Sequence, residues 1–193
     1  MTNAADRVPS LGEFAALVRA RRTSMHVDQS RSVPSELVDE IVELAIWAPN
    51  HKRTWPWRFA VFTGDGRFRL GEAFATDLGL AGINDEVRLA KTRRKYGRTP
   101  SVVAVASAPG DQAMRDDDRD AVAAGLQNFL LGATAVGLAS YWSSAPIVHA
   151  PTVVALCGFE PDTRIIAVVY LGWPDRQGLE APPRPAIRAR HIS

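Results

Sequence analysis

The sequence contains one cysteine, Cys157, and no long apolar run. A single cysteine excludes an internal disulfide framework and a multi-cysteine metal site, and it fits a reducing compartment. No stretch reaches the roughly eighteen uninterrupted apolar residues of a membrane span, and residues 1–6 contain no apolar segment of the kind that directs secretion. We therefore expect a cytoplasmic protein without a membrane partner.

Lysine is also scarce. Of the 23 basic residues, only Lys52, Lys91 and Lys95 are lysines, and the others are arginines. The formal net charge is +2. Arginine suits bidentate contacts to phosphate, whereas nucleic-acid binding needs a basic stripe. The densest basic cluster, at residues 88–98, falls in one helical pattern without a nucleic-acid-binding motif, so a solvated helix face explains it better. We expect no nucleic-acid partner.

Familiar catalytic motifs are absent. The sequence has no GxxxxGK[ST], no GxGxxG after a predicted strand, no HExxH and no GxSxG, which removes the main support for kinase and hydrolase functions. The four histidines, at positions 26, 51, 149 and 191, are too scattered to predict a metal site. Cys157 lies on the apolar side of a short predicted helix and is expected to be a small core residue.

Length and composition fit one folded domain. The chain has 193 residues, of which 46% are hydrophobic and 23% are charged, and a single core can still grow at this size. We expect one domain over residues 1–193, with its core at about 10–185 and an extended, proline-rich C-terminal arm at 174–193.

Hydrophobic periodicity predicts an alternation of helices and strands. The expected helices cover residues 10–22, 35–48, 67–77, 85–98, 118–138 and 150–156, and the expected strands cover 57–63, 101–108, 140–143 and 164–171. This order favours an α+β fold in which helices surround one sheet. The helix at 118–138 has almost no polar face, which is typical of a helix at the centre of a fold or at a subunit interface.

Three short polar segments follow predicted elements: Arg21-Arg22-Thr23, Ala48-Pro49-Asn50-His51 and Trp142-Ser143-Ser144. Functional sites are often built where regular elements end. Two guanidiniums and a hydroxyl suit a phosphate, because an anion needs charge and several hydrogen-bond donors. Taken alone, an arginine pair after a helix is better explained by capping, since cations there also stabilise the helix dipole.

The order of these segments resembles a known family. Arg21-Arg22-Thr23, Val33-Pro34, Ala48-Pro49 and Trp55-Pro56-Trp57 are similar to the N-terminal signature of the nitroreductase family, and residues 123–128 and 165–174 are similar to its central helix and closing strand. Asn50-His51-Lys52 is similar to the Asp-His-Lys of the small bacterial branch of NAD(P)H nitroreductases. The resemblance covers residues 10–185, the scale of a whole domain.

The resemblance implies a nitroreductase-like fold, with a central, mostly antiparallel sheet surrounded by helices, in an intertwined homodimer. It implies FMN as the cofactor and NAD(P)H as the electron donor. Both subunits would contribute residues to each FMN site. One subunit would supply Arg21, Arg22 and Thr23 at the phosphate and ribityl end, with Trp142, Ser143 and Ser144 along the same cofactor; the other would supply Trp47 and His51.

In this family the flavin carries the chemistry, so the resemblance implies no catalytic side chain. The implied activity is ping-pong hydride transfer from NAD(P)H to a nitroaromatic, a quinone or a similar electron-poor acceptor. Alternatives are a flavin-sequestering or storage protein, and a family member that dehalogenates, cleaves flavin or uses a deazaflavin. They stay open because Arg53 and Trp55 replace the wider family's Asn and Gln, while Trp47 and Ser143 stand where the branch can place Arg.

Overall fold

The computed structural model describes residues 8–108, 110–176 and 179–192. At its centre lies a four-stranded sheet with the strand order β1-β2-β4-β3, in which each neighbouring pair is antiparallel. The strands are β1 (Trp57–Thr63), β2 (Ser101–Ser107), β3 (Ala139–Ser144) and β4 (Arg164–Gly172). The predicted antiparallel sheet is confirmed, and each predicted strand matches an observed one to within one residue at either end.

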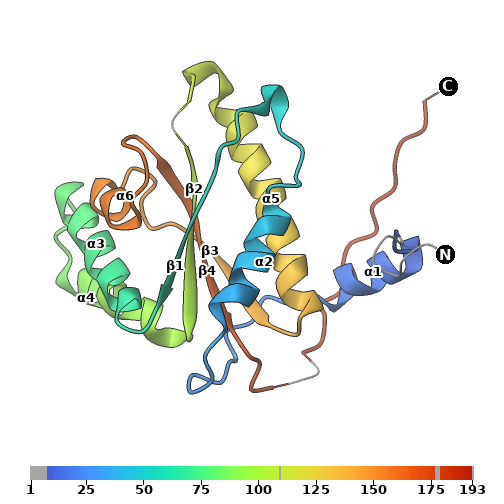
Figure 1. Ribbon diagram of the computed structural model, residues 1–193, viewed down its shortest axis with the longest axis horizontal. Helices are drawn as coiled ribbons and strands as arrows, with labels where there is room; N and C mark the ends of the chain where they lie inside the picture. Colours follow the sequence, from blue (N-terminus) through green and yellow to red (C-terminus); the bar gives the residue numbers. More distant parts are fainter. Residues whose placement is uncertain (1–7, 109, 177–178, 193) are drawn as a thin grey trace.

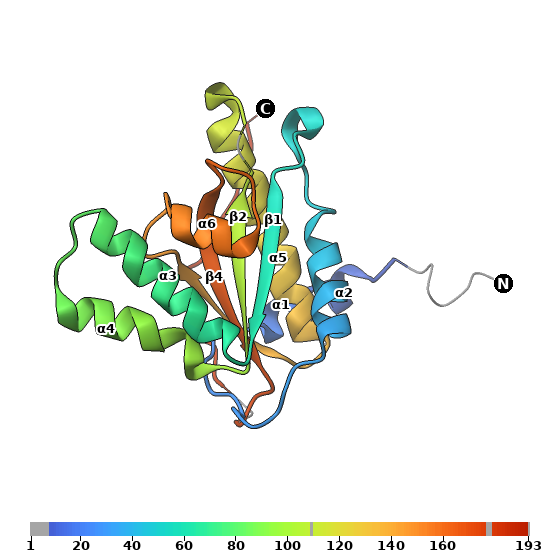
Figure 2. The ribbon, with the colours of Figure 1, turned by 60° about the vertical axis from the view of Figure 1, so that its left-hand side comes forward.

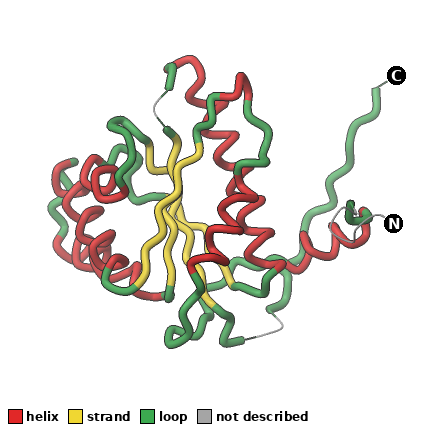
Figure 3. The backbone as a smooth tube through the Cα atoms, viewed as in Figure 1, coloured by secondary structure: helices red, strands yellow, loops and turns green. Residues whose placement is uncertain are grey.

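Helices cover both faces of this sheet (Figures 1 and 3). The α-helices are α1 (Leu11–Ala20), α2 (Ser35–Ala45), α3 (Gly66–Leu80), α4 (Glu86–Lys95), α5 (Arg115–Ala135) and α6 (Pro151–Cys157). Short 3₁₀ turns lie at η2 (His51–Arg53), η3 (Tyr96–Arg98) and η4 (Gln112–Met114). Helices α2 and α5 cover one face, while α3, α4 and α6 lie on the other, as the turned view in Figure 2 also shows. The apolar strand β2 is therefore buried along its whole length.

Helix α5 is the central helix that the apolar pattern predicts. It begins at Arg115, three residues before the predicted start at Asp118, because its first turn is acidic and carries no apolar signal. Acidic residues there favour a helix start, since they complement the positive end of the helix dipole. Its buried side packs against α2 and the sheet.

Helix α1 confirms the predicted capping box but not the predicted end. The Ser10 hydroxyl accepts a hydrogen bond from the Glu13 amide at 3.2 Å, and the Ser10 amide donates one to the Glu13 carboxylate at 2.7 Å. The helix ends at Ala20 rather than Arg22, and none of its residues is buried. Phe14, for example, is 50% exposed, so much of the apolar face of α1 stays exposed in the described chain, although the helix touches α5.

The C-terminal segment extends away from the sheet and passes beyond α1 (Figure 1). Within the described part of the predicted arm, residues 179–192 form no helix or strand, and each of them is exposed. Residues 177, 178 and 193 of that arm lie outside the described residues. Like α1, this segment places apolar side chains such as Ile187 in solvent within the single chain.

Candidate functional site

The segment Arg21-Arg22-Thr23 lies beside the start of β3. The Ser24 amide donates a hydrogen bond of 2.9 Å to the Ser140 carbonyl, and Thr23 forms an isolated parallel bridge with Ser140. The end of α1 is thereby attached to the edge strand that also carries Trp142, Ser143 and Ser144. Two of the three polar segments singled out in the sequence therefore meet at one sheet edge.

The two arginines of this segment differ in what they contact. The Arg22 guanidinium donates to the backbone carbonyls of Leu179 at 3.0 Å and Arg21 at 2.8 Å, and also to that of Arg19. Arg22 therefore ties the end of α1 to the C-terminal arm, in keeping with the capping interpretation. The Arg21 guanidinium makes one long contact, 3.4 Å to the Thr23 hydroxyl, so most of its donors have no partner among the described residues.

A cavity of about 440 Å³ opens at this segment. It is lined by Arg21, Arg22, Thr23, His26, Leu179, Glu180, Pro182 and Arg184. The lining contains three guanidiniums and one hydroxyl but only one carboxylate, so the donor set suits an anion. A guanidinium can bind phosphate through two parallel hydrogen bonds, and a hydroxyl can donate one more. The residues present therefore fit the phosphate end of FMN.

The residues of β3 divide between the two faces of the sheet. Trp142 is paired with Val169, which belongs to the core under α2 and α5, whereas Ser143 is paired with Val168 on the α3 and α6 side. Cross-strand partners share a face and side chains alternate along a strand, so Trp142 and Ser144 lie on one face and Ser143 on the other. One flat ligand can reach all three only at the open edge of β3.

His51 and Arg21 lie near opposite ends of α5 within one chain, whereas Trp47 follows the end of α2, where the Leu44 carbonyl accepts a hydrogen bond from Asn128. Trp47 and His51 are both exposed, and Trp47 is 77% exposed. Their segment joins α5 near its first turn through a hydrogen bond from Thr54 to Asp118, whereas Arg22 lines a cavity with Thr134 near the last turn of α5. Sixteen residues of helix separate these two anchor points, which is about 24 Å. The structure does not bring the two halves of the predicted site together in a single chain.

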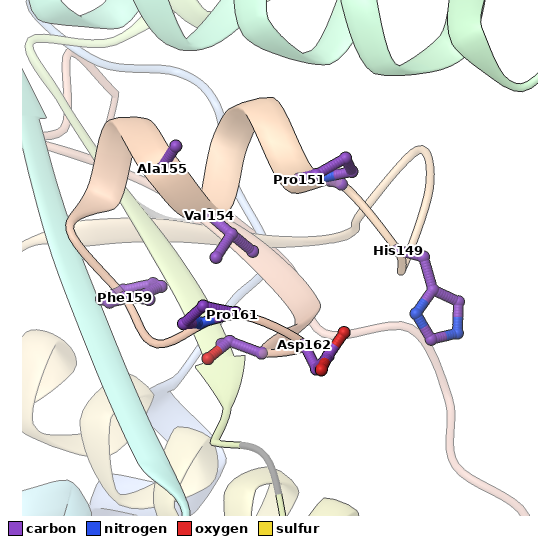
Figure 4. A pocket seen from close by; sticks show the side chains of 9 residues that line it. His149, Pro151, Val154, Ala155, Phe159, Pro161 and Asp162 are labelled. Carbon is purple, nitrogen blue, oxygen red and sulfur yellow. The ribbon is translucent and has the colours of Figure 1, made fainter.

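A second cavity, of about 450 Å³, lies between α6 and the start of β4 (Figure 4). Its lining is mostly apolar, with Val154, Phe159 and Pro161 around it and His149 and Asp162 at its rim. None of the predicted site residues lines it. It offers less positive charge to a phosphate than the cavity at Arg21.

A polar cluster that supports the His51 segment was not predictable from the sequence. Asn50, Thr54 and Asp118 are joined by hydrogen bonds, although Asp118 lies 64 residues beyond Thr54. Asp118 is 3% exposed. An acidic residue at the start of a predicted helix was the only signal in the sequence, and by itself it indicates a helix start.

Comparison with known proteins identifies the family. The sequence model of the nitroreductase family matches residues 18–173. The chain belongs to the nitroreductase family. It is 30% identical over 177 residues to "Putative NAD(P)H nitroreductase YfhC" of Bacillus subtilis (strain 168), and the match covers 90% of each sequence.

Solved structures of nitroreductases share this fold. The nitroreductase-like family protein from Bacillus cereus superimposes with a TM-score of 0.75 at 26% identity, covering 93% of this chain and 95% of that one. A nitroreductase from Bacteroides fragilis NCTC 9343, solved with bound FMN, gives a TM-score of 0.71 at 20% identity, covering 94% and 98%. The expected nitroreductase-like fold is confirmed.

Two negative findings apply to the part of the chain that the structure describes. No helix there has the length and apolar character needed to cross a membrane. The same residues also contain no group of three or more His, Cys, Asp and Glu side chains arranged to hold a metal ion.

Proposed function

We propose that this chain is an FMN-dependent oxidoreductase that transfers hydride from NAD(P)H to an electron-poor acceptor such as a nitroaromatic or a quinone. Its membership of the nitroreductase family supports this proposal, as do the name of its B. subtilis relative and the FMN bound to the B. fragilis protein. The observation that carries the proposal is the arginine-lined cavity at the end of α1, where the Arg21 guanidinium is largely unengaged.

The residues of this cavity would have different roles in binding FMN. Arg21 and Thr23 would donate hydrogen bonds to the phosphate, and Arg184 would add a second cation from the arm. Arg22 would act indirectly, because its bonds to backbone carbonyls fix the end of α1 and bring Leu179 of the arm to the cavity. Trp142 and Ser144 would border the cofactor along the edge of β3, and Ser143 would reach it only at that edge.

When bound, FMN supplies the two-electron chemistry, accepting hydride from NAD(P)H and passing it to the acceptor. The protein then needs no side-chain nucleophile. Its task is to orient the cofactor and to exclude water from the reacting face. The exposed indoles of Trp47 and Trp55 suit that second task, because a large apolar ring over the site displaces water.

A homodimer would complete the site. The Thr54 anchor of the His51 segment lies about 24 Å along α5 from Thr134, which lines a cavity with Arg22, so the two halves would meet through a second copy. Exposed apolar side chains on α1, such as Leu11 and Phe14, and Ile187 on the arm, supply surface for such an interface. A twofold axis would then form two equivalent sites.

Two measurements test the proposal. The purified protein should oxidise NAD(P)H steadily in the presence of a nitroaromatic or quinone, with ping-pong kinetics; binding of FMN without turnover would favour the sequestering alternative. Arg21→Ala should raise the dissociation constant for FMN at least about tenfold, since a hydrogen bond to a charged group contributes about 1.5–3 kcal/mol. Arg88→Ala, on exposed α4, is the matched control and should leave FMN affinity unchanged.

A further inference from the structure

The segment between α2 and β1 has an unusual backbone. Lys52, Arg53 and Trp55 have φ values of 53°, 54° and 52°, in the left-handed region that residues other than glycine avoid. Three such residues within four positions are unfavourable on their own. A conformation of this kind persists only where surrounding contacts impose it, and it is commonest at functional sites.

A chain of side-chain hydrogen bonds imposes this conformation. The Asn50 amide nitrogen donates to the Thr54 hydroxyl at 2.9 Å, and that hydroxyl donates to the Asp118 carboxylate. The Asn50 side-chain oxygen accepts from the Trp55 amide at 2.9 Å, which fixes the orientation of the Asn50 amide group. The strained turn is therefore closed by Asn50 and anchored through Thr54 to the first turn of α5.

The side chains that this turn presents do not explain why it is anchored. His51, Lys52 and Arg53 are exposed, and Trp55 is 57% exposed. None of the four contributes to a core cluster of the described chain. The anchor at Asp118, in contrast, is almost fully buried. A buried support thus fixes the backbone of a turn whose His51, Lys52 and Arg53 side chains are exposed.

We propose that Asn50, Thr54 and Asp118 are positioning residues that hold His51 and Trp55 in the conformation in which they meet the FMN site of the partner subunit. This inference rests on the proposed function, because it takes that site as the target. In this inference Asn50, Thr54 and Asp118 determine the geometry of the turn but do not themselves contact the cofactor or the substrate.

The chain of hydrogen bonds from Asn50 through Thr54 to Asp118 is called the relay below. A pair of substitutions at Thr54 tests it. Thr54→Val removes the hydroxyl with little change in shape, whereas Thr54→Ser retains it. Thr92→Val is the matched control: Thr92 is 5% exposed, its hydroxyl donates to the Arg88 carbonyl at 2.9 Å, and it lies on α4 away from the site. Asn50→Ala provides a second, half-exposed position if Thr54→Val does not fold.

The first measurement needs no cofactor. In the full-length apoprotein, hydrogen exchange of the Trp55 amide should quicken at least about tenfold in Thr54→Val and Asn50→Ala, and should stay near the wild-type rate in Thr54→Ser and Thr92→Val. Local opening of a turn exposes its amide in this way. Unchanged Trp55 exchange in both Thr54→Val and Asn50→Ala would overturn the relay.

The second measurement uses the protein loaded with FMN. Thr54→Val should lower kcat/KM for the acceptor about tenfold or more and alter the quenching of flavin fluorescence, because small misplacements near a reacting centre are costly. Thr54→Ser should restore both, and Thr92→Val should change neither. If the wild type binds FMN and turns over but Thr54→Val matches it in kcat/KM, the positioning role is wrong. If the wild type binds no FMN, the proposed function fails instead, and the exchange measurement still decides the relay.

Discussion

The indole nitrogen of Trp57 donates a hydrogen bond of 2.9 Å to the backbone carbonyl of Ala121, which fixes the start of β1 against α5. The contact requires a close approach between the strand and the helix. Gly125 makes that approach possible: a Cβ atom there would lie 2.6 Å from the Trp57 indole nitrogen and 2.7 Å from the Ala45 carbonyl oxygen.

Gly125→Ala should therefore destabilise the fold. The added methyl group meets a buried ring and a backbone oxygen, neither of which can move away easily, and such overpacking costs about 1–3 kcal/mol. Gly132→Ala is the matched control on the same helix, because its methyl group meets the movable end of Leu44 at 2.7 Å and alanine favours helix by about 1 kcal/mol. Urea unfolding should rank Gly125→Ala well below Gly132→Ala; equal stabilities would contradict the packing account.

Asp77 should stabilise the fold through α6. It is 2% exposed, and its carboxylate accepts hydrogen bonds from the amides of Thr152 and Val153 at 3.0 and 3.1 Å. Asp77→Ala would leave the buried Val153 amide and the half-buried Thr152 amide at the start of α6 without this partner, at a cost of about 1–3 kcal/mol for the buried one and less for the other. Thermal or urea unfolding measures the loss, and a variant within about 0.5 kcal/mol of wild type would show that the cap contributes little.

Local sequence patterns predicted which segments form helices and strands better than they predicted where each helix ends. The capping box at Ser10 and the apolar runs of the strands are local signals, and the structure confirms them. The end of α1 at Ala20 was not predictable, because the backbone after it turns away to pair with Ser140. That pairing joins residues more than a hundred positions apart in the sequence.

The sequence was enough to predict which segments form the candidate site, but not how those segments are arranged in space. Order along the chain indicated Arg21, Thr23 and Trp142, and the structure brings their segments to one sheet edge. The relay through Thr54 and Asp118 depends on a tertiary contact across 64 residues. The placement of Ser143 on the opposite face from Trp142 follows from strand alternation, a constraint that a list of site residues leaves out.

The ion pair between Arg58 and Glu160 predicts a pH dependence of stability. The Arg58 guanidinium, at 2.5–3.1 Å from the carboxylate, lowers the pKa of Glu160 from its ordinary value of 4.5 to about 2. The stabilisation is therefore present above pH 4.5 and is lost as the pH falls towards 2. Because the pair is partly exposed, Glu160→Gln should cost at most about 1 kcal/mol at neutral pH. Wild type and variant should converge as the pH falls below 2; a difference that does not shrink between pH 5 and pH 2 would contradict this assignment.

Cys157 should react slowly in the folded protein. Burial raises the pKa of its thiol to about 12, so little thiolate is present at pH 8, and the thiolate is the reactive form. Modification by iodoacetamide should accelerate strongly when the chain is unfolded in urea, and mass spectrometry can follow it because the chain has one cysteine. Equal rates in the folded and unfolded protein would contradict the predicted burial.

We expect FMN to bind at the Arg21 cavity of a dimer. The most direct test titrates the apoprotein with FMN, follows the flavin absorption bands, and measures the mass of the complex by light scattering. We predict one FMN per chain in a particle of two chains, with at least about tenfold weaker binding in Arg21→Ala. Failure of the wild-type protein to bind FMN, or saturation of a stable monomer, would contradict the account.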